Sequence, residues 1–129
     1  MKSNRDLALD LTKKADHDLR MAEIGLAHEA PLDTVAFHVQ QTAEKMLKAL
    51  LASRNVEYPR THDVELLIDL AAPLCPELAA HREPLLGLSA YAVDMRYAAD
   101  LDPSREEVDA ALQSVRRLRE TVGRLLATP

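Results

Sequence analysis

The stretch "AFHVQQTAEKMLKALLASR" (residues 36–54) decides the fold, because it carries two helical patterns at once. Its apolar residues recur at every third or fourth position, which is the period of one face of an α-helix. They are Ala36, Val39, Ala43, Met46, Leu47 and Leu50. We expect a helix from about Thr34 to Arg54, and at ~1.5 Å per residue it would be about 30 Å long. A helix of this length spans a small domain from end to end.

The same helix carries a second, polar face. Phe37, Gln41, Glu44 and Lys48 follow one another at helical spacing, with Lys45 beside them. Two interpretations stay open. The face is either solvated and holds one stray aromatic ring, or it lies against a partner while the apolar face packs into the bundle. Under the second interpretation these five residues form a partner interface.

The rest of the sequence also favours helices. Alanine and leucine dominate, whereas the β-branched and aromatic residues typical of strands are scarce: there are one Phe, three Tyr and no Trp. Further helices are expected at about residues 4–29, 62–71 and 83–98, and from Ser104 almost to the C-terminus, with proline-containing breaks between them. Ser104 and Glu107 form a capping box that begins the last helix.

Short connections between helices make neighbours antiparallel. We therefore expect an all-α protein, an antiparallel up-and-down helical bundle of four to five helices, folded as a single domain over residues 1–129. Alternating directions would bring the end of the helix at 34–54, the start of that at 62–71 and the end of that at 83–98 to one pole.

Composition and charge exclude several classes of function. The net charge of −5 argues against a general nucleic-acid coat, and the lack of aromatic residues argues against a stacking platform for single strands. The arginines in "SVRRLRE" (114–120) spread around their helix, which indicates a solvated face. No apolar run reaches the length of a signal peptide or a membrane span, so we expect a soluble, cytoplasmic protein.

Motifs for cofactors and metals are also missing. There is no glycine-rich phosphate loop and no zinc motif. His62 and Glu65 have the i, i+3 spacing of one di-iron half-site, but a metal centre in a bundle needs a second helix of this kind, and the sequence has none. The single cysteine, Cys75, has no partner for a disulfide or a zinc motif and is expected to be a small buried hydrophobe. We therefore predict neither a cofactor nor a metal.

The segment "PRTHD" (59–63) concentrates polar residues at the start of a helix. Thr61 is a candidate N-cap, and Asp63 suits the positive end of the helix dipole, but neither role accounts for Arg60 or His62. Each of these two residues is either structural or part of a site.

The second unexplained arginine is Arg96, in "YAVDMRY" (91–97). It falls near the apolar stripe of its helix, where a guanidinium must reach the bundle end, pair with a carboxylate or bind an anion. If the pole predicted above is correct, Arg60, His62, Arg96 and the adjacent Tyr97 form a nucleotide- or anion-binding site there.

These motifs resemble those of the HEPN domain family. The resemblance rests on "AFHVQQTAEKMLKALLASRNVEYPRTHDVELLIDL" (36–70) and "YAVDMRYAADLDPSREEVDAAL" (91–112), and "ADHDLRMAEIGL" (15–26) also fits. It implies a helical bundle that forms a homodimer and is often encoded beside a small nucleotidyltransferase, in toxin–antitoxin or nucleotide-handling pairs. It also implies that ribonuclease activity must be considered.

Ribonucleases of this family use an arginine and a histidine separated by four to six residues. Here Arg54 precedes His62 with seven residues between them and Arg60 precedes it with one, so the usual motif is missing. We therefore expect a non-catalytic HEPN-type binding module for a nucleotide or a partner nucleotidyltransferase. Two alternatives remain.

The first alternative is a metal-independent ribonuclease toxin acting on RNA. In that enzyme His62 is the acid–base, and Arg54 or Arg96 stabilises the phosphorane charge. The second alternative is a purely structural interaction protein, whose only functional surface is the face of Phe37.

Overall fold

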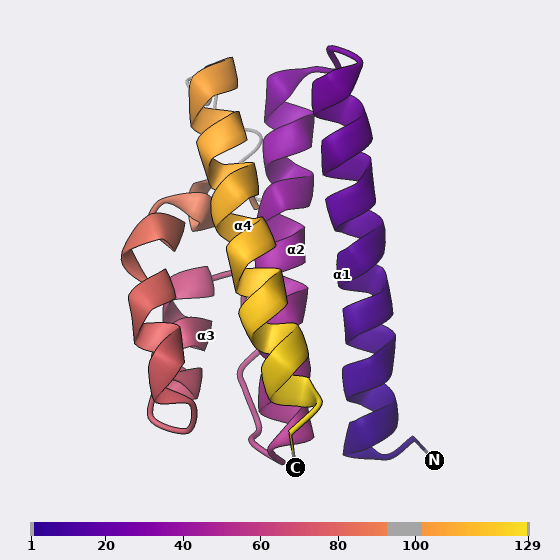
Figure 1. Ribbon diagram of the computed structural model, residues 1–129, viewed down its shortest axis with the longest axis vertical. Helices are drawn as coiled ribbons and strands as arrows, with labels where there is room; N and C mark the ends of the chain where they lie inside the picture. The colour runs from indigo at the N-terminus through magenta and orange to yellow at the C-terminus, as the bar shows by residue number, and fades with distance from the viewer. Residues whose placement is uncertain (1, 93–101, 129) are drawn as a thin grey trace.

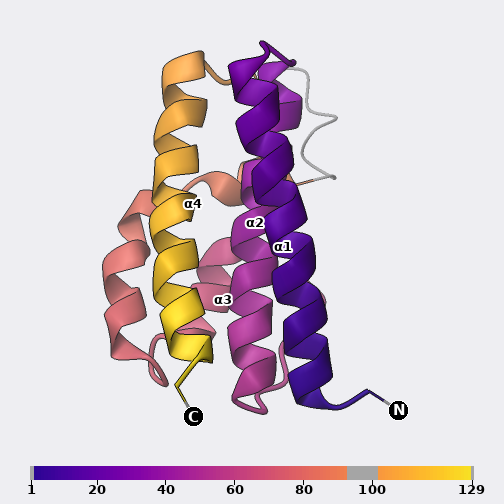
Figure 2. The ribbon, with the colours of Figure 1, turned by 45° about the vertical axis from the view of Figure 1, so that its right-hand side comes forward.

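The computed structural model describes residues 2–92 and 102–128 (Figure 1). Its central element is α2 (Leu32–Ser53), which lies between α1 (Asn4–Ala27) and α4 (Arg105–Leu126) (Figures 1 and 2). Fourteen of the 22 residues of α2 are buried, which marks it as the core helix. The apolar stripe predicted for residues 36–50 is buried in full. The all-α bundle is confirmed, and the described residues contain no strand.

The termini of the long helices agree with local capping signals. The hydroxyl of Ser104 accepts from the backbone of Glu107, whose carboxylate accepts from the backbone of Ser104, so the predicted capping box is present. At the start of α3 (Val64–Ala71) the N-cap is Asp63, which accepts from the Leu66 N–H. The prediction of Thr61 as N-cap was therefore wrong by two residues.

The segment after α3 differs from the predicted helix at 83–98. It consists of short 3₁₀ turns, η1 (Pro76–His81), η2 (Glu83–Leu85) and η3 (Leu88–Tyr91). Between η2 and η3 the backbone of Gly87 adopts a φ of 89°, a left-handed conformation that interrupts a helix and favours glycine. Residues 93–98 of the predicted helix lie outside the described residues.

After α2 the chain reverses direction and runs back along that helix. Residues 54–63 lead to α3 beside the middle of α2, and α4 then runs in the same direction as α2 (Figure 1). Both chain ends consequently lie at the same end of the bundle (Figure 2). Cys75 is buried, as predicted. Within the described residues, none of the helices combines the length and apolar character needed to cross a membrane.

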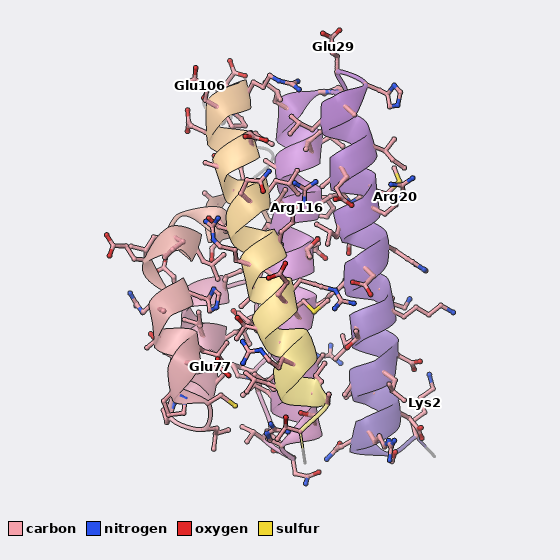
Figure 3. The ribbon with its side chains drawn as sticks, in the orientation of Figure 1. Lys2, Arg20, Glu29, Glu77, Glu106 and Arg116 are labelled. Atoms are coloured by element: carbon pink, nitrogen blue, oxygen red, sulfur yellow. The ribbon has the colours of Figure 1, made fainter. Side chains whose placement is uncertain are left out.

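Ion pairs join α4 to α1. Arg116 donates to Glu23 at 2.7 Å and Arg119 donates to Asp16 at 3.1 Å. The side chains of these four residues are partly exposed. Figure 3 labels Arg116 on the side of α4 that faces α1. The expectation of a simple solvated face at 114–120 is corrected, because two of its arginines reach carboxylates on the neighbouring helix.

The seam between α1 and α2 is narrow because small residues line it. Ala8, Ala15 and Ala22 are the buried alanines of α1, and a Cβ added to Gly25 would meet the Cγ2 atom of Val35 at 2.9 Å. Val35 is itself buried, so it has little room to give way.

Replacing this glycine tests the close approach. Gly25→Ala should lower the free energy of unfolding by about 1 kcal/mol, because overpacking outweighs the gain in helix propensity. Gly123→Ala on α4 is the matched control: its added Cβ meets only the flexible end of Arg119, and stability should rise by about 0.5 kcal/mol. Urea unfolding of the three proteins measures both effects, and equal changes in the two variants would contradict the packing argument.

Candidate functional site

Glu44 is the centre of the polar site. It lies in the middle of α2, is only 4% exposed, and accepts hydrogen bonds from four side chains. The distances to Oε1 are 2.8 Å from His62 Nδ1, 3.1 Å from Gln40 Nε2 and 3.3 Å from Gln41 Nε2, and Oε2 lies 3.0 Å from Lys48 Nζ. A buried carboxylate is stable only when its oxygens are satisfied in this way.

Gln40 connects this carboxylate to the segment that carries His62. It is fully buried, and its Nε2 donates both to Glu44 and, at 2.9 Å, to the backbone carbonyl of His62. The amide of Gln41 donates to the Gln40 oxygen at 2.7 Å and so fixes the orientation of that side chain. The position of His62 is therefore determined by both its ring and its backbone.

The hydrogen bonds also keep Glu44 ionised. Burial by itself raises the pKa of this carboxyl group, but the donors His62, Gln40 and Lys48, together with the positive charge of Lys48, lower it below the usual 4.5. An ionised carboxylate cannot donate, so the hydrogen in its bond to His62 is on Nδ1. Nε2, on the other side of the ring, has no partner among the described residues.

An open pocket of about 560 Å³ lies beside this imidazole. Its lining comes from the segment before α3 and from the region of η3: Arg60, Thr61, His62, Asp63, Ser89, Ala90 and Ala92. The exposed Arg60 has no hydrogen bond or ion pair within the described part of the chain. The pocket thus combines a guanidinium, an oriented imidazole and two small apolar side chains.

Hydrogen bonds hold the two walls of the pocket together. Ser89 Oγ accepts from the Val64 N–H at 3.0 Å and donates to Asp63 Oδ1 at 3.5 Å. The hydroxyl of Thr61 accepts from the Asp63 N–H at 2.9 Å. The roles of Asp63 and Ser89 are therefore mainly structural: Asp63 caps α3, and Ser89 links the start of α3 to η3.

Two of the predicted anion-binding residues, Arg60 and His62, meet in this pocket. Arg96 and Tyr97 lie outside the described residues, and Ala92 is the residue nearest to them in sequence that lines the pocket. The predicted location at a pole was wrong for His62, because its contacts with Gln40 and Glu44 place it beside the middle of α2.

The guanidinium of Arg54 binds the end of α4 and makes no contact with His62. It donates to the carbonyls of Leu125 at 3.0 Å and Thr128 at 3.2 Å, at the C-terminal end of α4. Carbonyls at a helix end lack helical partners and are favourable acceptors for a cation. Within the ribonuclease alternative, these contacts place the Arg54 guanidinium at the end of α4 and give it no contact with His62.

The predicted partner face of α2 is largely covered by the chain itself. Gln41 and Glu44 are buried under the network described above, and Phe37 is half-buried with its ring edge-to-face against His38. Lys48 pairs with Glu44, and Lys45 pairs with a carboxylate of α1. The assignment of Glu44 to a partner contact is corrected, because residues 54–63 fold back over it.

Lys45 belongs to a second polar cluster, at the seam with α1. Asp18 is 9% exposed; its Oδ1 lies 2.9 Å from His38 Nδ1 and its Oδ2 lies 2.5 Å from Lys45 Nζ. Within the described residues, no group of three or more His, Cys, Asp or Glu side chains is arranged to hold a metal ion.

Sequence reasoning missed Asp18, His38 and Gln40. For Asp18 and Gln40, the position in the helical pattern of the sequence could have indicated a buried polar role. Asp18 stands at helical spacing between Ala15 and Ala22, and Gln40 occupies a position on the apolar stripe of α2. A polar side chain on an apolar stripe must find a buried partner. His38 carried no comparable signal.

The fold and site together define a helical-bundle domain with an imidazole anchored on a buried carboxylate. A family model described as "HEPN domain" matches residues 8–125. This is nearly the whole chain, and the protein belongs to the HEPN domain family. Comparison with curated proteins and with solved structures gives no match.

The lowered pKa of Glu44 leads to a pH-dependent contribution to stability. Because the folded-state value lies below the unfolded one, the contribution is present above about pH 4.5 and is lost as the pH falls through the folded-state value. Glu44→Gln should cost about 2 kcal/mol at pH 7. The difference in unfolding free energy between wild type and variant should shrink as the pH is lowered to 3.5. Urea unfolding at several pH values measures this, and a constant difference would contradict it.

Proposed function

We propose that this chain is a non-catalytic HEPN-type binding module that takes a phosphate-bearing ligand, such as a nucleotide, in the pocket beside His62. One observation carries the proposal: Arg60 and His62 line the same open pocket, while Glu44 binds the imidazole of His62 through Nδ1. Membership in the HEPN family supports the class of protein, which includes nucleotide-handling members.

The chemistry of the pocket suits a phosphate. A guanidinium forms paired hydrogen bonds to phosphate oxygens, and Arg60 has no competing partner among the described residues. A protonated His62 keeps its Nδ1 hydrogen on Glu44 and donates the Nε2 hydrogen to a second oxygen. Ala90 and Ala92 leave an apolar wall for the remainder of the ligand.

Nucleotide titration tests the proposal. Arg60→Ala should weaken the binding of adenosine monophosphate about tenfold, because one charge-assisted contact is lost. Arg20→Ala, which removes an exposed arginine from α1, is the matched control and should change the affinity less than about twofold. Isothermal titration calorimetry measures both. Equal affinities in wild type and Arg60→Ala, or no binding to the wild type, would reject the pocket.

The alternative of a metal-independent ribonuclease toxin has one specific observation in its favour. A neutral imidazole that donates Nδ1–H to a carboxylate presents a lone pair at Nε2, the arrangement of a general base held by an orienting group. Arg60 is then the cation that the described pocket offers for the phosphorane charge, in place of Arg54.

Expression in cells separates the two functions. If the chain is a ribonuclease toxin, induction of the wild type should arrest growth, His62→Ala should relieve the arrest, and RNA should be cut in the presence of a chelator. The binding module is expected to be harmless and to leave RNA intact. His17→Ala is the control, since it removes an exposed histidine from α1.

We also propose the assembly that the family implies, a homodimer that pairs with a small nucleotidyltransferase in a toxin–antitoxin or nucleotide-handling system. The half-buried face of α2 around Phe37 is the candidate contact. The purely structural alternative uses this face alone.

The mass in solution of wild type and Phe37→Glu tests the contact. A dimer should become monomeric in the variant, because a carboxylate replaces apolar contact area at the interface. A monomer in both proteins would discard the face as a dimer contact, and a dimer in both would place the interface elsewhere.

A further inference from the structure

The two buried carboxylates at the polar side of α2 are held in the same way. Asp18 accepts from the Nδ1 of His38 at 2.9 Å and from the ammonium group of Lys45 at 2.5 Å. Glu44 accepts from the Nδ1 of His62 at 2.8 Å and from the ammonium group of Lys48 at 3.0 Å. Each carboxylate therefore binds one imidazole and one lysine.

The two groups are attached to adjacent turns of α2 through their lysines. Lys45 and Lys48 are three residues apart on α2, which corresponds to a rise of ~4.5 Å and to adjacent turns. The group of Asp18 lies toward α1 and that of Glu44 lies toward residues 54–63. We call the surface made by His38, Lys45, Lys48 and His62 the paired-histidine face.

The side chains that carry the carboxylates are less exposed than those that carry the nitrogen atoms. Counting side-chain atoms alone, Asp18 and Glu44 are 12% and 6% exposed, whereas the side chains of the paired-histidine face are between 15% and 48% exposed. Because Nδ1 of each ring is bound to a carboxylate, Nε2 is the ring nitrogen left for a ligand, and it donates to a phosphate oxygen when the ring is protonated.

We propose that His38 and Lys45 form a second anion subsite beside the pocket of His62 and Arg60, so that the ligand carries at least two phosphate groups on one chain. This inference rests on the proposed function and specifies its ligand. Two sources share the chemistry: the contiguous phosphates of a nucleoside triphosphate, and the successive phosphates of a short single strand. A simple clamp between α1 and α2 is the competing explanation of the Asp18 cluster, and it predicts no effect on ligand choice.

His38→Asn separates a subsite from a clamp. The asparagine amide retains a donor near the place of Nδ1, so the bond to Asp18 is kept, and the Nε2 atom is removed. The ligands are adenosine monophosphate, adenosine triphosphate and a 5′-phosphorylated adenosine dinucleotide, titrated by calorimetry at one ionic strength. His17→Asn, at an exposed histidine of α1, is the matched control.

The wild type should bind one of the two longer ligands about tenfold more tightly than the monophosphate, because the second phosphate gains charge-assisted contacts. His38→Asn should lose this preference and retain monophosphate binding, while His17→Asn keeps both. The longer ligand that gains affinity identifies the source. Lys45→Met tests the same subsite independently and should also lose the preference. Unfolding midpoints confirm that each variant is folded.

An unchanged preference in folded His38→Asn and Lys45→Met, or no preference in the wild type, would overturn the second subsite. The proposed function would then survive if monophosphate binding still depended on Arg60. Absence of any binding to the wild type would reject both the subsite and the proposed function. The two failures are therefore distinguishable.

Discussion

The carboxylate of Glu44 sits in the middle of the most buried helix, and the surrounding structure depends on its being satisfied. An uncompensated charge at this depth would be strongly destabilising, and the α2 helix supplies only part of the compensation, through Gln40, Gln41 and Lys48. The remaining donor is His62, eighteen residues away in sequence. This bond forms where the chain after α2 runs back along the helix (Figure 1).

This return has consequences for the rest of the fold. Gln40 binds the backbone of His62, so α3 begins beside the middle of α2, and η3 is joined to that point through Ser89. The pocket is the space left between these two segments. Its geometry thus follows from the burial of a charge, and the residues that shape it, Gln40 and Ser89, are different from those that a ligand would contact.

Around α2, the acidic side chains are more deeply buried than the basic side chains that bind them. The net charge is −5, yet around α2 the carboxylates lie inside and the nitrogen-bearing side chains lie outside. Lys45 and Lys48 each neutralise one buried carboxylate, so the negative charge is compensated locally on a protein whose total charge repels polyanions at a distance.

The sequence by itself determined the long helices α1, α2 and α4, the apolar stripe of α2 and the capping box at Ser104, because these depend on spacing within about one or two helical turns. Its motifs also indicated the family. The helix expected from residue 83 did not follow from the sequence, because short 3₁₀ turns lie within residues 83–91. Sequence reasoning also paired Arg60 with His62, which are neighbours in the chain. Only the tertiary structure decided that Glu44 anchors His62, that Asp18 anchors His38 and that Arg54 binds the end of α4. Those contacts join residues 18 to 74 positions apart, and they arise because buried charges and unpaired carbonyls must find partners wherever packing brings them.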